Sequence, residues 1–375
     1  MTGIRHSRTS IFDLQPDDDI IIGDLTYSVK QSSCGGMGFV LFLRRESRRG
    51  VAMAPQHVSA DSDDPIDFLN SLNAQSRQGR ISVHGTKLAL KTVRPDAVGA
   101  EGKALFKREL TIWAALRHPS IVCLNEILDA GSDGWVAAMD WCQGSLRDIL
   151  NKRQRLSLKE ATGIIGDLLD GLAFAYHQDR VLHLDLKPEN ILYDLDIAPT
   201  ARNILYEVAG DAQAKIPNTP INKCRFMLAD WGIASIKQPQ LNAIAGTPPT
   251  SQAALRTFNH MGTLLYMAPE RFCEGFHSSI ASDVFSLGMI YLEMLTGTLP
   301  YRQGVHPVES LLTGRYHQDA EVLMSKARVP RSICRQILSM LAANPNSRPN
   351  DHTALAGSIA RAYKETGSLI SKLLN

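Results

Sequence analysis

His-Leu-Asp-Leu-Lys-Pro-Glu-Asn, at residues 183–190, is the stretch that restricts the fold and the chemistry of this chain most. It follows residues 164–172, whose apolar side chains recur with the period of a helix. It supplies a carboxylate, a cation and a carboxamide at Asp185, Lys187 and Asn190. Phosphoryl transfer needs these groups: the carboxylate faces the acceptor hydroxyl, the cation meets the moving phosphate and the carboxamide oxygen binds a metal ion. The stretch therefore predicts a phosphotransferase site after a helix.

Further motifs follow this stretch in the C-terminal half of the chain. They are FMLADWG at residues 226–232, GTLLYMAPE at residues 262–270, a helical pattern that opens at Asp283, and NPNSRP at residues 344–349. In the first of these, Asp230 ends an apolar strand and offers a second metal-binding oxygen group. In the last, Arg348 is the residue that a family resemblance, given next, implies as the buried ion-pair partner of Glu270.

These motifs, in this order, resemble those of the eukaryotic-like (Hanks-type) Ser/Thr protein kinase family. Residues 183–190 are similar to the kinase catalytic loop, whose usual form is His-Arg-Asp-Leu-x-x-x-Asn. Asp230, Trp231 and Gly232 stand where kinases carry Asp-Phe-Gly, and residues 262–270 resemble the end of a kinase activation segment. The resemblance implies an α+β, two-lobed protein-kinase-like fold, with a small antiparallel β-rich N-lobe and a larger helical C-lobe.

The N-terminal half contains a glycine-rich stretch, SCGGMGFV at residues 33–40. It fits the phosphate-covering loop of kinases, Gly-x-Gly-x-x-Gly-x-Val, with Ser33 at the position of the first glycine. Gly35 and Gly38, at the second and third positions, let backbone N–H groups approach phosphate oxygens without a clash at Cβ. Taken alone, the pattern also fits a plain hairpin turn.

A second N-terminal signal is Lys91, which ends the alternating strand pattern Leu-Ala-Leu-Lys at residues 88–91. The pattern is similar to the Val-Ala-Ile-Lys of kinases. Taken alone, Lys91 would be an exposed strand lysine. Glu109 lies on the helical stretch 105–116 and is available as its ion-pair partner. The resemblance implies that Lys91 holds the α- and β-phosphates while Glu109 fixes the Lys91 side chain.

The resemblance implies a set of site residues with ATP and Mg²⁺ as cofactors. The expected catalytic residues are Asp185, Lys187, Lys91 and Glu109; the Mg²⁺ ligands are Asn190 and Asp230; the substrate-seating residue is Thr263; and the ATP contacts are Ser33, Gly35, Gly36, Gly38, Val40, Ala89, Lys91, Met139, Asp140, Cys142 and Leu192. Asp185 would orient the acceptor hydroxyl and accept its proton. Asp140 and Cys142 would contact adenine through their backbone, which requires no particular side chain.

Two features of the catalytic loop indicate the kind of kinase. Lys187-Pro188-Glu189 resembles the Ser/Thr enzymes, whereas tyrosine kinases usually carry Ala and Arg at the first and third of these positions. Leu184 stands where most regulated kinases have an Arg that pairs with a phosphate on the activation segment. Leu has no donor for that phosphate. A loop of this non-Arg-Asp type predicts basal activity on a protein substrate without phosphorylation of the segment.

Composition excludes several other classes. The chain has 40 basic and 38 acidic residues, so it produces no large electrostatic field. This near-neutral balance disfavours nucleic acid as a partner. No apolar run is long enough for a membrane span, and residues 1–19 lack the apolar core of a secretory signal. The six cysteines show no C-x-x-C spacing and indicate thiols in a reducing compartment, hence a cytoplasmic protein. The oligomeric state stays open.

The chain is expected to divide into three parts. Residues 1–20 read as a polar N-terminal extension, 21–141 as the N-lobe with an insertion over about 44–84, and 142–375 as the C-lobe with an insertion over about 195–224. Both insertions fall where loops can grow without disturbing a core.

Three alternatives share part of this pattern. A small-molecule phosphotransferase of kinase-like fold would keep Asp185 and Asn190 but typically lacks the GTLLYMAPE motif. A catalytically dead pseudokinase would usually have lost a charged residue of the site, and here only Ser33 and Trp231 depart from the kinase pattern. A nucleic-acid-binding protein would carry a more basic composition. Phosphate transfer to a protein substrate would separate the first two from a protein kinase.

Overall fold

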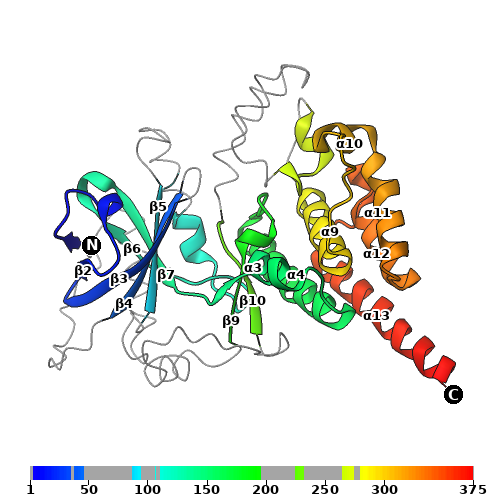
Figure 1. Cartoon of the computed structure of the whole chain (residues 1–375), viewed down its shortest axis with the longest axis horizontal. Coiled ribbons are helices and arrows are strands. Elements are labelled where there is room, and N and C mark those ends of the chain that lie inside the picture. The colour runs from blue at the N-terminus through cyan, green and yellow to red at the C-terminus, as the bar shows by residue number, and fades with distance from the viewer. Residues whose placement is uncertain are drawn as a thin grey trace. The chain divides into compact units, whose positions relative to one another are not determined.

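A computed structural model describes residues 3–34, 38–45, 87–93, 106, 110–195, 224–231, 264–273 and 279–374 (Figure 1). The chain divides into two compact units. The N-terminal unit contains the described residues up to Arg117 together with Val122–Trp141, and the C-terminal unit contains His118–Ile121, Cys142–Leu195 and the described residues from Cys224 onwards. The predicted insertions over 44–84 and 195–224 fall largely outside the described residues.

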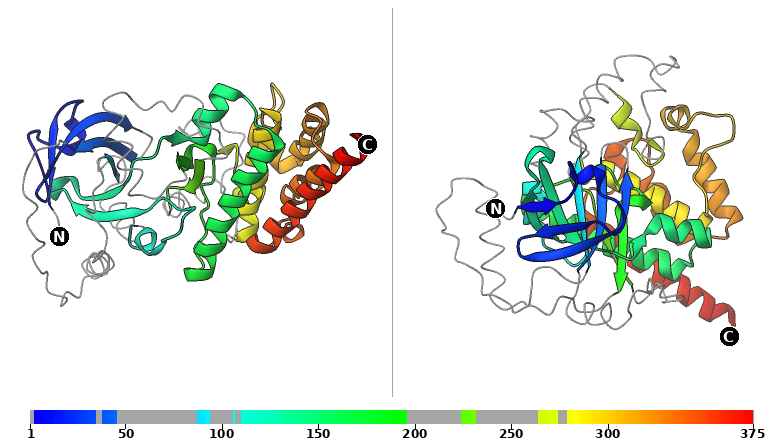
Figure 2. Two further views of the ribbon diagram at one scale, coloured as in Figure 1. Left: turned by 90° about the horizontal axis from the view of Figure 1, so that it is seen from below. Right: turned by 60° about the vertical axis from the view of Figure 1, so that its left-hand side comes forward.

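The N-terminal unit is built on one antiparallel sheet (Figure 2). Its strands are β1 (Ile4–His6), β2 (Asp19–Ile22), β3 (Leu25–Cys34), β4 (Gly38–Arg45), β5 (Lys87–Val93), β6 (Leu124–Asp129) and β7 (Trp135–Asp140), in the order β1-β2-β3-β4-β5-β7-β6. Two short 3-10 helices, η1 (Ile11–Asp13) and η2 (Gly131–Asp133), connect strands. The predicted antiparallel β-rich N-terminal part is confirmed.

Strand alternation gives this sheet two different faces. Apolar side chains at every second position, such as Leu41 and Leu43 in β4 and Leu88 and Leu90 in β5, belong to one buried core cluster. The residues between them face the other side, because successive side chains of a strand point to opposite faces. The second face therefore carries Lys91 together with the mostly apolar residues considered below.

The N-terminal segment packs on the core face of the sheet. The sequence predicts a polar extension over residues 1–20, whereas Ile11 and Leu14 are fully buried in the core cluster. Asp133 in η2 fixes the segment, since its carboxylate accepts hydrogen bonds from the Ser10 hydroxyl and the Ile11 N–H. Isolated apolar residues among polar ones have no period that reveals their burial, so only the sheet shows their place.

The C-terminal unit is mainly helical and contains one small sheet. Its helices are α3 (Leu146–Arg153), α4 (Leu158–Asp179), α9 (Ile280–Thr296), α10 (Pro307–Thr313), α11 (Arg315–Lys326), α12 (Arg331–Met340) and α13 (His352–Leu374), with the 3-10 turns η3 (Pro188–Asn190), η5 (Pro269–Phe272) and η6 (Pro345–Ser347). The sheet has the order β10-β9-β8, from β8 (Gly144–Ser145), β9 (Ile191–Leu195) and β10 (Cys224–Leu228). The predicted helical C-terminal part is confirmed, and with it the α+β class.

Helices α4 and α9 form the centre of the C-terminal unit. α4 starts at a capping box, in which Ser157 and Glu160 satisfy each other's backbone N–H, and it packs against α9, α13 and β10 (Figure 1). Every residue of α9 from Ala281 to Leu295 is buried, as expected for a helix surrounded by protein on all sides. None of the described helices is both long and apolar enough to cross a membrane.

Candidate active site

The start of the catalytic loop is anchored by Asp283, which lies in the first turn of α9. Asp283 is completely buried, and its two carboxylate oxygens accept hydrogen bonds from the N–H groups of His183 and Leu184, at 2.8 Å each. Burial raises the pKa of Asp283 to about 6, and the two backbone donors and Arg271 oppose that rise. Leu184 adopts a left-handed backbone with φ +59°, which costs a non-glycine residue roughly 1–2 kcal/mol. The Asp283 contacts therefore hold an unfavourable turn in place.

The three residues that the sequence singled out lie together in this loop. The Asn190 side chain donates from Nδ2 to the Asp185 backbone carbonyl at 2.8 Å and to its carboxylate Oδ2 at 3.0 Å. Lys187 Nζ lies 3.2 Å from the same Oδ2. Asp185 and Asn190 are both buried, so these bonds form away from bulk water. The carboxylate is thus held by a cation and a carboxamide on the same loop.

Strand pairing brings Asn190 and Asp230 to one end of the small sheet. Ile191 and Leu228 pair directly, and the Ala229 N–H donates to the Asn190 carbonyl at 2.9 Å. Asn190 therefore precedes the paired ends, and Asp230 follows them with a left-handed φ of +68°. The predicted metal ligands lie at neighbouring positions, although they are 40 residues apart in sequence.

The uncharged side chain of His183 contacts the backbone at this end of the sheet. Burial lowers the pKa of His183 to about 4, so its ring is uncharged at neutral pH. His183 Nε2 lies 2.9 Å from the Ala229 carbonyl, and Nδ1 lies 3.4 Å from the Asp185 N–H. A neutral ring satisfies both contacts when Nε2 carries the proton. Trp231, which stands at the Phe position of the Asp-Phe-Gly motif in the sequence, packs on the imidazole with ring centroids 4.9 Å apart, and its indole is buried.

The donor set fits magnesium better than a transition metal. The amide nitrogen of Asn190 donates to Asp185, so the amide oxygen points away from Asp185 and is the atom that could bind a metal ion. Asp230 offers a carboxylate. Among the described residues, no three His, Cys, Asp or Glu side chains gather into a metal-binding cluster. Mg²⁺ is typically bound by one or two protein oxygen groups together with substrate phosphates, which agrees with a sparse set of this kind.

The N-terminal unit places its predicted nucleotide contacts on the second face of the sheet. Val40 pairs with Lys91, and Ala89 pairs with Met139. Directly paired residues and every second residue of a strand share a face, so these four side chains line one surface, which we call the Lys91 face. Lys91 is 7% exposed in spite of its charge. Ser33 lies opposite Val40 and is exposed.

The remaining predicted contacts are found in both units or fall outside the described residues. In the N-terminal unit Gly38 opens β4, and Asp140 closes β7 with its carboxylate accepting from the Asn125 amide at 2.7 Å. In the C-terminal unit Cys142 is buried, and Leu192 pairs with Ser145 and Met227. Gly35, Gly36, Glu109 and Thr263 lie outside the described residues, so their predicted roles stay predictions.

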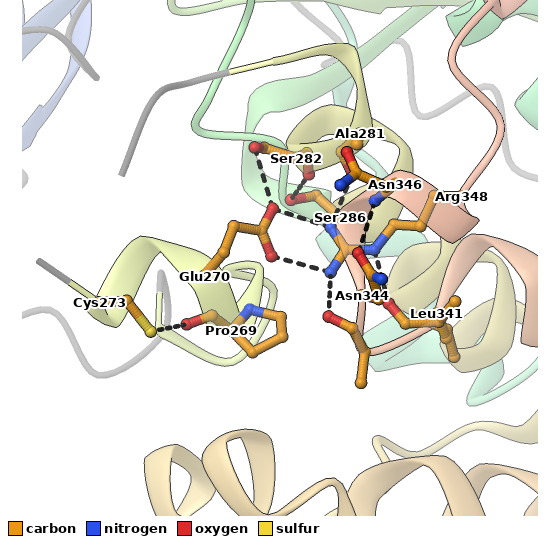
Figure 3. Close-up of polar contacts among 12 residues, drawn as sticks. Pro269, Glu270, Cys273, Ala281, Ser282, Ser286, Leu341, Asn344, Asn346 and Arg348 are labelled. Atoms are coloured by element: carbon orange, nitrogen blue, oxygen red, sulfur yellow. Dashed lines mark hydrogen bonds and ion pairs between the residues drawn. The ribbon is translucent and has the colours of Figure 1, made fainter. Parts of the chain in front are cut away.

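The ion pair expected between Glu270 and Arg348 is present (Figure 3). Two guanidinium nitrogens of Arg348 bind the two carboxylate oxygens of Glu270, each at 2.8 Å, and Ser282 donates to the same carboxylate at 3.1 Å. Arg348 also donates to the carbonyls of Ala281 and Ala342. Its side chain is fully buried, and this pair attaches residues 264–273 to the helical core.

Sequence reasoning missed two arginines near the catalytic loop. Arg147 in α3 binds Glu189 at 2.7 Å and Glu293 at 2.8 Å, and it also donates to the Tyr266 hydroxyl. Arg271 in η5 donates to the carbonyl of Leu184. The only available signal for Arg271 was a charged residue directly after the Ala-Pro-Glu of residues 268–270.

The chain was compared with known protein families and proteins. It matches the protein kinase domain family over residues 73–358, a range that starts after the glycine-rich stretch. It is 29% identical over 263 residues to the serine/threonine-protein kinase PkaB of Streptomyces coelicolor, covering 70% of this chain and 54% of that protein. It is 27% identical over 282 residues to the serine/threonine-protein kinase PrkC of Bacillus subtilis, covering 74% of this chain and 36% of that one.

A solved structure agrees with the fold. The crystal structure of Rad53 residues 1–466 in complex with AMP-PNP matches with a TM-score of 0.55 at 17% identity, and the match covers 92% of this chain and 74% of that one. At this identity the likeness concerns the fold alone. The chain spans about half or less of the length of the two curated relatives above. The family match extends over most of the chain, and the chain belongs to the protein kinase domain family.

Proposed function

We propose that the chain is an ATP-dependent serine/threonine protein kinase, which transfers the γ-phosphate of ATP to a protein hydroxyl. The observation that carries this proposal is the arrangement of Asp185, Lys187 and Asn190, held in a buried loop by Asp283. PkaB and PrkC are named as serine/threonine-protein kinases, which supports the same substrate class. The Lys-Pro-Glu sequence at residues 187–189 supports it as well.

Each residue of the loop has a part in the transfer. Asp185 accepts a hydrogen bond from the acceptor hydroxyl, orients its oxygen towards the phosphate and takes its proton late in the reaction. Lys187, close to Asp185, offsets negative charge on the moving phosphoryl group. Asn190 keeps the Asp185 carboxylate in place through two hydrogen bonds from its amide.

The cofactors follow from the same groups. Asn190 and Asp230 would hold Mg²⁺, which when bound offsets the charge of the phosphate oxygens. Lys91 would bind the α- and β-phosphates from the N-terminal unit, and its burial strengthens a charge interaction relative to one in water. Val40, Ala89 and Met139 share its face and offer an apolar surface to adenine.

The catalytic loop is of the non-Arg-Asp type. Leu184 offers no cation to a phosphate on the activation segment, so phosphorylation there has no partner at this position. The loop is held by the Asp283 carboxylate, which accepts hydrogen bonds from the backbone N–H groups of His183 and Leu184. We therefore propose that basal activity does not require phosphorylation of the segment from Asp230 to Glu270.

The cysteines support a cytoplasmic location. Five cysteines are free thiols: Cys123, Cys142, Cys224, Cys273 and Cys334. Free thiols persist where the surroundings are reducing, which is the condition of the cytoplasm.

The test is phosphate transfer from radiolabelled ATP with Mg²⁺ to a generic protein substrate, followed by identification of the phosphorylated amino acids. We expect phosphoserine and phosphothreonine with the wild-type chain and almost none with Asp185→Asn. Label on tyrosine alone would contradict the proposed residue class. Equal transfer by wild-type and Asp185→Asn protein would contradict the proposed active site.

A further inference from the structure

Two consecutive residues of η5 enter two separate buried contacts. Glu270 binds Arg348, which belongs to the loop before α13 (Figure 3). Arg271 extends to a different element and donates a hydrogen bond from Nη1 to the carbonyl of Leu184 in the catalytic loop. The segment 264–273 is therefore connected both to the helical core and to the residue before the catalytic carboxylate.

Leu184 is held at both of its backbone polar groups. Its N–H donates to Asp283, and its carbonyl accepts from Arg271. The carbonyl belongs to the same peptide group as the N–H of Asp185, so a donor on this oxygen sets the plane from which the Asp185 side chain departs. A left-handed leucine backbone needs such support, because without it the extended or right-handed regions are preferred.

The charge of Arg271 is placed among carboxylates. The side chain is 7% exposed, and burial lowers the pKa of its guanidinium, while attraction to Asp283, Asp185 and Glu270 opposes that effect. A guanidinium remains protonated in proteins, so the group stays a cation even here. A buried cation is costly unless it is paired and hydrogen-bonded, and Arg271 is stabilised by its hydrogen bond to the Leu184 carbonyl and by attraction to these carboxylates.

Attachment of the segment does not account for Arg271. Arg348 already fixes the segment through Glu270 and through the carbonyls of Ala281 and Ala342. The guanidinium of Arg271 makes its hydrogen bond to the catalytic loop instead, one residue before Asp185. This contact concerns the geometry of the active site more directly than the attachment of the segment.

We propose that Arg271 is a positioning residue of this active site, whose guanidinium holds the Leu184 carbonyl and so fixes Asp185 towards the acceptor hydroxyl without any phosphate on the chain. The inference rests on the proposed kinase function for its effect on turnover. Its effect on the loop itself does not depend on that function. A cation supplied by residues 264–273 thus compensates for the absence of one at position 184.

The experiment replaces Arg271 and measures both the reaction and the loop in the full chain. We expect Arg271→Met to lower kcat by about 10- to 100-fold, with the KM for ATP within about twofold, because a misplaced catalytic group slows the chemical step. Hydrogen exchange of the amides in residues 183–190, measured without substrate, should accelerate by about tenfold or more. Arg271→Lys keeps the charge with a single ammonium group and should fall between wild type and Arg271→Met in both measurements.

Arg302→Met is the matched control. Arg302 also binds a carboxylate in the C-terminal unit, with Nε 2.7 Å from Asp319, but its side chain is 63% exposed and lies outside the site. This variant should keep kcat and the exchange of residues 183–190.

The possible outcomes separate the two proposals. Wild-type kcat and wild-type exchange in Arg271→Met would overturn the positioning role. So would faster exchange of equal size throughout α9 and α13, which would show general loosening. If Arg271→Met does not fold, the same two measurements on Arg271→Lys decide in the same way. A wild-type chain that transfers no phosphate would contradict the proposed function, while the exchange measurement would still decide the role of Arg271.

Discussion

In the catalytic loop each functional side chain is held by individual bonds, whereas on the Lys91 face the position of a side chain follows from strand pairing. Asp185 depends on Asn190, Lys187 and the anchors at Leu184. Lys91 depends on the register of β4, β5 and β7, which many backbone hydrogen bonds maintain together. A side chain that is held by individual bonds can be displaced by one substitution in a distant element. A side chain that is placed by strand register moves only when the strand slips or unfolds.

The largest expected effect is on Asp185. Asp185→Asn should lower kcat by about 10²-fold or more, because the proposed proton acceptor is lost while the size of the side chain is kept. Radiolabel transfer at saturating ATP gives kcat, and circular dichroism checks the fold. Activity within a few-fold of wild type would show that another group accepts the proton.

A second prediction concerns the ion pair between Glu270 and Arg348, which lies away from the reacting groups. Arg348→Met should lower the free energy of unfolding by about 3–5 kcal/mol, because it leaves Glu270 with an uncompensated charge in a part-buried site. Arg302→Met removes an exposed pair and should cost at most about 1 kcal/mol. Urea unfolding followed by far-UV circular dichroism measures both, and equal losses would contradict the role assigned to burial.

A third prediction concerns the N-terminal segment, which packs on the core face of the N-terminal sheet. Ile11→Ala should destabilise the N-terminal unit by about 2–5 kcal/mol, because Ile11 is fully buried in the core cluster. Ile21 in β2 is only partly buried, so Ile21→Ala should cost less. Hydrogen exchange in β3 and β4 reports the difference. No change in Ile11→Ala would restore the interpretation of residues 1–20 as an independent polar extension.

A fourth prediction uses acid to weaken the helical unit. Burial lowers the pKa of His352 from 6.5 to about 4, so the folded protein disfavours its protonation. The stability from this group is therefore complete above pH 6.5 and is lost as the pH falls from 6.5 to about 4, by up to roughly 1.4 kcal/mol per pH unit. His352→Phe should reduce this slope relative to the wild-type chain. Urea unfolding between pH 5 and 7 measures the slopes, and identical slopes would contradict the assignment.

The smallest expected effect is that of phosphatase treatment. Complete dephosphorylation should change kcat by less than about twofold, since Leu184 gives a segment phosphate no partner. A variant with Ser235, Thr247, Thr250, Ser251 and Thr257 changed to Ala should behave in the same way. Loss of activity in both would show that a cation elsewhere binds a phosphate, and the loop would then not be held by Asp283 and Arg271 alone.

Much of the site was accessible from local sequence. Asp185, Lys187 and Asn190 lie within six residues, so their spacing alone predicted a common loop. The Glu270–Arg348 pair was predicted over a distance of 78 residues because both positions belong to recurring motifs. Glu109 and Thr263, predicted in the same way, are outside the described residues and stay predictions.

The sequence by itself determined the family and the α+β fold, and it predicted the residues of the catalytic loop, because each of these follows from motifs with fixed spacing or from periodicity. Only the tertiary structure decided how the loop is held. The contact between Arg271 and Leu184 joins residues that are 87 positions apart, and neither residue belongs to a pattern that implies the other. The burial of Ile11 and Leu14 was also decided at this level, because a surface for them exists only after the sheet has formed. Local structure can be predicted from the spacing of residues in the sequence. The burial of a cation or of an apolar side chain depends instead on which helices and strands pack together.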